Sequence, residues 1–466
     1  MSSIITKYPL TETRDIVIGG AFALMGAAIF TLMVLTVPAK VQYIIVFSVL
    51  PILFLSSLNF LYTVTALVVI LFLNIHIGYF SSAVLFVPVV VISFFFTCRN
   101  IKWNDVSNPL TKYLLIYTVS VIPSLYNLNT VTGPFLFSLN YIALVSLFYI
   151  LTVAMTDKSI VARIFTVFTG MVMLNALHVI ILSAITKKRE FGFAGIMFVD
   201  YIGIAFTMML PLLLRSSRKK QHWLLAMIIM FGIAEMLTQT RGIWLATGIA
   251  SGIVVLLVYF RQEFFRISRS SIAKFVFIAV LGAVLLYVIV LVINPGVASR
   301  TKQIGQFQTE AFVELGVIDN SLVTRLLIWH TAFQGFQAHP ITGIGFYSFQ
   351  FSSQLYKTIS PLLYNRYVKS LTPHETFVAV LTETGLLGFI GFSVLLFGMY
   401  RIAVSNFSLC ETENQKTYAL VLFAGLVYIG CSMLITDAWL WGQGIVLWGL
   451  VLASVVSFSK YKHTID

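Results

Sequence analysis

Apolar residues recur along the chain in runs of about 20, separated by short polar breaks. A run of that length spans roughly 30 Å of hydrocarbon as an α-helix. We therefore predict an all-α polytopic membrane protein with about 12–14 transmembrane helices. The expected spans are residues 16–37, 41–57, 60–78, 82–98, 110–127, 134–156, 160–186, 194–214, 222–238, 243–260, 272–294, 377–400, 418–435 and 441–458.

The composition agrees with a membrane protein. Of 466 residues, 59% are hydrophobic and only 10% are charged, which is more apolar surface than a water-soluble fold can bury. The net charge of +13 does not indicate a nucleic-acid partner, because the basic residues lie in short loops between spans. The two densest basic segments, 215–221 and 261–274, are separated by one hairpin and fall on the same side. The positive-inside rule then places both termini in the cytoplasm and residues 295–376 outside it.

One long polar interval divides the chain. We expect an N-terminal transmembrane bundle over residues 1–294, an extracytoplasmic loop over 295–376 and C-terminal transmembrane helices over 377–466. Within the loop, residues 321–339 are expected to form an amphipathic helix that contacts membrane lipids at the interface. Residues 350–371 are polar and aromatic and are expected to form a mobile loop. The apolar stripe of the amphipathic helix would consist of Leu322, Leu326, Trp329, Phe333 and Phe336.

His374 is the candidate general base. Thr372 and Glu375 have the spacing of a capping box, and Pro373 would take the first helical position. His374 would then lie in the first turn of a helix, where the macrodipole favours neutral imidazole over imidazolium. The alternative is a polar helix start at a membrane surface.

Three arginines are candidates for binding a diphosphate at the outer face: Arg189, Arg241 and Arg325. A guanidinium can form two charge-assisted hydrogen bonds to one phosphate group. The alternative is that they anchor the chain at the interface or contact lipid headgroups. Asp200 and Glu235 lie within expected spans, where a charge costs roughly 2.5–3.5 kcal/mol. Their predicted role is to hold an arginine in place.

Several sites for cofactors are missing from the sequence. It contains no P-loop, no clustered outer carboxylates, no compact zinc-ligand spacing and no Gly-x-Ser-x-Gly elbow. We therefore expect no metal and no cofactor. A reaction at the outer face must then use an activated donor whose leaving group cations can bind, and a polyprenyl diphosphate-linked sugar meets that need.

Three motifs resemble the O-antigen ligase/polymerase family in order and spacing. They are TQTRGIWLA at 238–246, the segment from SLVTRLLIWH to HPITGIGFYSF at 321–349, and PHETFVAVLTETGLLGFIGF at 373–392. The resemblance implies a fold like that of the membrane-embedded C-type glycosyltransferases, with metal-independent, inverting transfer of glycan from undecaprenyl diphosphate. It implies that Arg241 and Arg325 bind the diphosphate and that His374 activates the acceptor hydroxyl. Glu375 is a departure, because the family commonly has Asn there.

The motifs leave the acceptor open. A polymerase would extend another lipid-linked glycan, whereas a ligase would transfer to lipid A core. A flippase for the same lipid-linked oligosaccharide is the alternative from another class. Transporters typically place charges near the bilayer midplane within repeated halves, whereas the charges here concentrate at one face. The sequence favours a glycan polymerase of the bacterial cytoplasmic (inner) membrane, with its active site on the extracytoplasmic side.

Overall fold

The structure, a computed structural model, describes most of the chain from residue 60 onward. The described residues are 60–72, short pieces between 76 and 94, and then 108–297, 321–436 and 442–462, apart from 130, 156–157, 217 and 296. The expected spans 16–37 and 41–57 lie outside the described residues, and 82–98 is described only in pieces.

Helices make up nearly all of the described chain. The only strands among the described residues are β1 (His76–Ile77) and β2 (Phe80–Ser81), a two-residue antiparallel pair. The first group of helices is α4 (Phe60–Leu71), α7 (Thr111–Val121), η1 (Ile122–Asn127), α8 (Thr132–Ala154), α9 (Lys158–Thr186), η2 (Gly192–Met197), α10 (Phe198–Arg215), α11 (Arg218–Leu237), α12 (Arg241–Phe260), α13 (Gln262–Phe265) and α14 (Arg269–Ile293). The second group is α16 (Ser321–Ala338), α17 (Phe349–Ser352), η4 (Ser353–Tyr356), α18 (Pro361–Tyr367), α19 (Thr376–Ser408), α20 (Glu413–Met433) and α21 (Gly442–Tyr461).

The all-α membrane class is confirmed. Within the described residues, seven helical segments are long and apolar enough to cross a membrane. Each coincides with an expected span, because hydropathy over 18 or more residues is the signal that a bilayer selects. They are Gly133–Ala154, Ile160–Thr186, Gly192–Arg215, Lys219–Leu237, Arg241–Phe260, Thr376–Ser408 and Glu413–Met433. The total of 12–14 spans stays a prediction.

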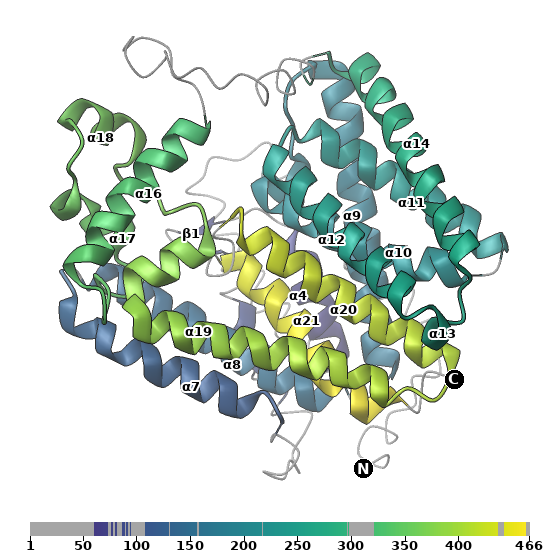
Figure 1. Ribbon diagram of the computed structural model, residues 1–466, viewed down its shortest axis with the longest axis horizontal. Coiled ribbons are helices and arrows are strands. Elements are labelled where there is room, and N and C mark those ends of the chain that lie inside the picture. Colours follow the sequence, from purple (N-terminus) through teal and green to yellow (C-terminus); the bar gives the residue numbers. More distant parts are fainter. Residues whose placement is uncertain are drawn as a thin grey trace.

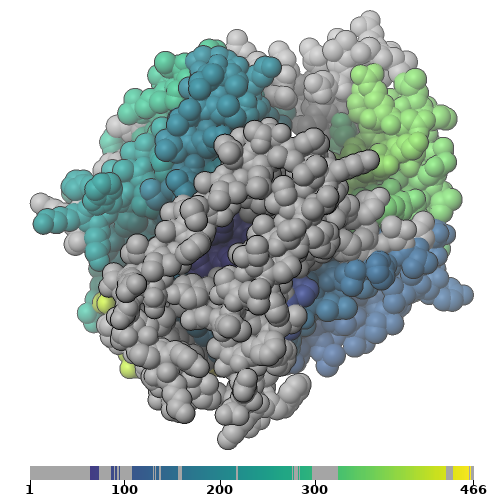
Figure 2. Space-filling view, turned by 180° about the vertical axis from the view of Figure 1, so that it is seen from behind, coloured from purple at the N-terminus to yellow at the C-terminus, as the bar shows by residue number. Residues whose placement is uncertain are grey.

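Two groups of helices meet along α20. On one side α10 and α12 pack against α20, and α11, α9 and α14 extend that group. On the other side α19 packs against α7, and α21 packs against α8. Figure 1 shows α16, α17 and α18 above the α7 and α19 end, apart from the group formed by α9 to α14. Seen from behind in Figure 2, the α9 to α14 group and the α16 to α18 group again lie on opposite sides of the molecule.

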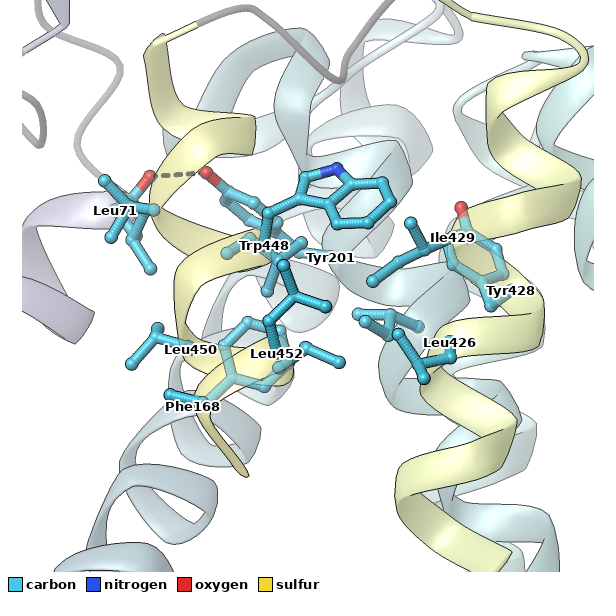
Figure 3. Close-up of a cluster of buried hydrophobic side chains, with 14 of the residues drawn as sticks. Leu71, Phe168, Tyr201, Leu426, Tyr428, Ile429, Trp448, Leu450 and Leu452 are labelled. Carbon is cyan, nitrogen blue, oxygen red and sulfur yellow. Dashed lines mark hydrogen bonds between the residues drawn. The ribbon is translucent and has the colours of Figure 1, made fainter. Parts of the chain in front are cut away.

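The core between α10, α20 and α21 is aromatic and aliphatic. Trp448 of α21 lies between Tyr201 of α10 and Ile429 and Tyr428 of α20 (Figure 3), and all four side chains are buried. The Tyr201 hydroxyl donates to the Leu71 carbonyl of α4 at 3.1 Å, which supplies the partner that a buried phenol needs. This contact joins the N-terminal part of the described chain to the core.

Helix α19 is not continuous. Gly385 has φ 64° and ψ −167°, a region open in practice only to glycine, and the helix breaks there. The turn that follows α16 gives a new hydrogen-bond partner to each of four backbone groups beside the break. Its N–H groups bond the carbonyls on one side of the break, and its carbonyls accept from the N–H groups on the other. The four bonds run from Ile344 N to Thr382 O (3.0 Å), from Gly345 N to Glu383 O (3.1 Å), from Leu386 N to Pro340 O (2.9 Å) and from Leu387 N to Ile341 O (3.2 Å).

The predicted helix over residues 321–339 is confirmed as α16, but its buried face is not the predicted stripe. The side chains that pack inward include Ile328, Thr331 and Ala332, all 0% exposed. Leu326 and Phe333 of the stripe are 42% and 53% exposed. Leu326 and Phe333 are thus open to contact with lipid, whereas Trp329 of the stripe packs against the small core beside α16, and the place of the helix in the membrane interface stays a prediction.

The expectation that residues 350–371 form a loop is wrong, because most of them lie in helices. This segment contains η4 and α18, and Tyr364 and Val368 are buried in a small core with Ile328 of α16. Ser360 caps α18 by accepting from Leu363 N at 3.4 Å, and Pro361 takes the first helical position. The apolar residues in this stretch are too few for a span but enough to cover one face of α16.

Candidate functional site

His374 lies just before α19, not inside it. The helix begins at Thr376, and its N-cap is Glu375, whose carboxylate accepts from Phe377 N at 3.0 Å and from Val378 N at 2.6 Å. The predicted capping box of Thr372 and Glu375 is therefore wrong, as is the placement of Pro373 at the first helical position. Glu375 still caps the helix, but it does so as the N-cap residue itself.

The contacts of the Pro373 carbonyl and of Phe377 N fit this later start. In a helix beginning at Pro373, Phe377 N would donate to the Pro373 carbonyl. That carbonyl instead accepts from Nε1 of Trp329 at 3.0 Å, while Phe377 N is bound by Glu375. His374 consequently adopts φ 56° and is half-buried.

The bond from Trp329 brings α16 to His374. Arg325 precedes Trp329 by four residues, so the two side chains share one face of α16. Neighbours at that spacing lie roughly 5–6 Å apart at Cβ, so Arg325 lies beside the residue that bonds the His374 segment. Arg325 is half-buried on that face.

Arg241 occupies the first turn of α12, and Arg189 supports the same turn. Arg189 Nε donates to the Thr238 carbonyl at 2.7 Å, and its Nη2 donates to Thr240 Oγ1 at 2.9 Å. The Arg189 guanidinium also lies over the Phe191 ring, 4.5 Å from the centroid. Arg189 and Arg241 thus lie at one turn, and two of the Arg189 donors are used to shape it.

The arginine turn and the histidine segment meet at the end of α20. Gly242 is packed so closely against Ile435 that a Cβ there would collide with that side chain. The next residue, Thr436, accepts a hydrogen bond at its carbonyl from Thr376 Oγ1 at 2.7 Å. Residues 435 and 436 therefore have the Arg241 turn on one side and the start of α19 on the other.

The two carboxyl groups within the spans lie in α10 and α11. Asp200, in the first turn of α10, accepts from Ser432 Oγ at 2.6 Å and from Tyr428 OH at 3.4 Å. Glu235, near the end of α11, is 4% exposed, and its Oε1 has no hydrogen-bond partner within the described part of the chain. The predicted role of Asp200 and Glu235 in holding arginines stays a prediction.

Glu383 is a structural residue of this region that the sequence did not single out. Its carboxylate is buried and accepts from Tyr347 N at 3.1 Å and from Phe349 N at 3.0 Å. It thereby anchors the chain between α16 and α17 to the broken helix α19. The available signal was the Glu-x-Gly spacing of Glu383 and Gly385, whose partners 36 and 34 residues upstream cannot be identified from spacing.

Comparison with known protein families gives a match that lies mostly in the second half of the chain. Residues 225–393 match the model of the family described as O-antigen ligase. The matched segment begins in α11 and ends in α19, so it contains Arg241, Arg325, His374 and Glu383, whereas Arg189 and Asp200 precede it. A comparison with curated proteins gives no match.

Proposed function

From the match of residues 225–393 to the O-antigen ligase family, we propose that the protein transfers a glycan from a polyprenyl diphosphate-linked donor to a sugar hydroxyl acceptor. The reaction takes place at the outer face of the bacterial cytoplasmic membrane. The observation that supports the proposal is that residues 435 and 436 contact Gly242, which follows Arg241, and Thr376, two residues after His374. The helix that carries Arg325 reaches the same segment through the bond from Trp329 to the Pro373 carbonyl. Cations and a histidine at one place suit a reaction with an anionic leaving group and a hydroxyl nucleophile.

In the proposed mechanism, the imidazole of His374 removes the proton of the acceptor hydroxyl. The acceptor oxygen attacks the anomeric carbon from the side opposite the diphosphate, so the configuration inverts. The bond between the anomeric carbon and the diphosphate oxygen breaks, and the electron pair leaves with the diphosphate. Arg241 and Arg325 bind the charge that develops on the leaving group, so no metal is required.

Arg241→Lys tests the diphosphate role. Lysine keeps the charge but loses the planar pair of donors, so we expect transfer from a purified lipid-linked donor to fall on the order of tenfold or more. Arg261→Lys is the matched control, because Arg261 is exposed at the other end of α12. Equal turnover of the two variants would show that Arg241 is only an interfacial anchor.

The acceptor is best identified in cells that lack the gene. We favour a polymerase, for which loss of the protein leaves single repeat units that are still exported. A ligase onto lipid A core would instead leave long polymer that is not attached to lipid A. Accumulation of units on the cytoplasmic side would contradict glycan transfer and indicate a flippase.

A further inference from the structure

The backbone of His374 is held in an unusual conformation. Its φ of 56° lies in the left-handed region, which is disfavoured for any residue with a Cβ. Such residues persist where the surrounding structure determines their conformation from several sides, and they cluster at functional sites. The contacts on either side of His374 therefore matter for where its ring lies.

Both neighbours of the His374–Glu375 pair are tied to other helices. On the upstream side, the Pro373 carbonyl accepts from Trp329 of α16 at 3.0 Å. On the downstream side, Thr376 Oγ1 donates to the Thr436 carbonyl beyond α20 at 2.7 Å. Thr376 is 1% exposed, so water does not compete for this hydroxyl.

Thr436 is in turn connected to the buried carboxylate of α10. Its N–H and its Oγ1 both donate to the Ser432 carbonyl, at 2.8 and 3.1 Å. The Ser432 hydroxyl donates to Asp200 Oδ1 at 2.6 Å. Asp200 and Ser432 are 8% and 6% exposed, so this chain of hydrogen bonds lies inside the protein. A charge-assisted bond of this length is the strongest kind available to a hydroxyl.

We propose that Asp200, Ser432, Thr436 and Thr376 form a positioning relay that sets the place of His374 relative to Arg241. Thr436 follows Ile435, which packs against Gly242 beside Arg241, so the relay ends at the contact between the two motifs. The expected change in kcat rests on the proposed function. The four relay residues themselves touch no substrate and act only by fixing the start of α19.

The test compares two replacements of Thr376. Thr376→Val keeps the shape and removes the hydroxyl, whereas Thr376→Ser keeps the hydroxyl. The matched control is Thr207→Val in α10, whose buried hydroxyl donates only within its own helix, to the Gly203 carbonyl at 2.8 Å. With the purified full-length protein and a lipid-linked donor, we expect Thr376→Val to lower kcat about ten- to a hundredfold, because small misplacements of a reacting group are costly.

Three comparisons identify a positioning role. The KM for the donor should stay within about threefold, since the diphosphate ligands are intact. Thr376→Ser should restore kcat to within about threefold of the parent protein. The thermal midpoints of Thr376→Val and Thr207→Val should agree, and Ser432→Ala provides a second break in the relay if Thr376→Val fails to fold.

A second readout needs no substrate. Diethyl pyrocarbonate acylates histidine, and mass spectrometry gives its rate at His374 relative to His222, which is exposed at the start of α11. We expect Thr376→Val, but not Thr207→Val, to change this ratio at least threefold. If the parent protein transfers no glycan and the ratio still changes, the proposed function fails and the relay stands. If Thr376→Val matches Thr207→Val in both kcat and the ratio, the relay is overturned.

Discussion

Replacement of His374 by alanine is expected to lower the rate of glycan transfer by roughly 10²–10⁴, the usual contribution of general-base assistance. The protein should still fold, because the side chain is half-buried and the contacts that hold its segment come from Trp329 and Thr376. The measurement is kcat with purified protein, a lipid-linked donor and saturating acceptor. Donor KM should change little, since no phosphate ligand is removed.

His374→Asn separates chemistry from backbone conformation. Asparagine tolerates the left-handed region better than alanine does, but it cannot accept the proton. We expect His374→Asn to be as inactive as His374→Ala. His330→Ala is the control, because His330 is exposed on α16 and its Nε2 bonds Thr358 Oγ1 at 2.8 Å. Near-normal transfer by either His374 variant would remove this residue from the chemistry.

The membrane-spanning helices could be predicted from hydropathy because the bilayer selects for it directly. The expected spans 160–186 and 243–260 differ from α9 and α12 by only a few residues. A span needs about 20 apolar residues wherever it packs, so its existence does not depend on its neighbours. The same argument fails for α18, which exists because Tyr364 and Val368 cover α16.

Predictions of helix starts and of helix continuity from local sequence failed where tertiary contacts replaced helical hydrogen bonds. The Thr372–Glu375 spacing is a sound capping signal, but Trp329 takes the carbonyl that a helix starting at Pro373 would need. Residues 377–400 are predicted as one span, yet the helix breaks at Gly385, where a turn from residues 340–345 supplies four replacement bonds. Neither partner can be identified from sequence spacing alone.

The candidate site was predictable only where a residue type is unusual for its place in the sequence. Arginine and histidine stand out at the ends of apolar spans because their presence there needs a reason. Trp329, Thr376 and Glu383 do not stand out, since tryptophan, threonine and a single carboxylate are ordinary at helix ends. Their roles depend on carbonyl or N–H groups of distant residues, which only the fold brings within hydrogen-bond distance.

Glu383→Ala is expected to be the most destabilising single replacement discussed for this protein. It leaves the N–H groups of Tyr347 and Phe349 buried without an acceptor, and each such loss costs about 1–3 kcal/mol. Removal of a buried side chain adds a cavity term of the order of 1 kcal/mol. The free energy of unfolding should therefore fall by about 3–7 kcal/mol, since the two N–H losses and the cavity add. Glu263→Ala is the control, because Glu263 is exposed on α13.

The loss should appear first where α19 holds the turn that follows α16. Hydrogen exchange of the peptide covering residues 343–352 should accelerate on the order of a hundredfold or more, because about 1.4 kcal/mol corresponds to tenfold in an opening equilibrium. Transfer activity should fall with it at temperatures below the global unfolding midpoint, since α16 carries both Arg325 and the Trp329 bond to Pro373. Accelerated exchange in this peptide with unchanged activity would mean that the turn is not needed to hold α16 against His374. Unchanged exchange would mean that the four backbone bonds across the break at Gly385 are sufficient to hold the turn without the carboxylate.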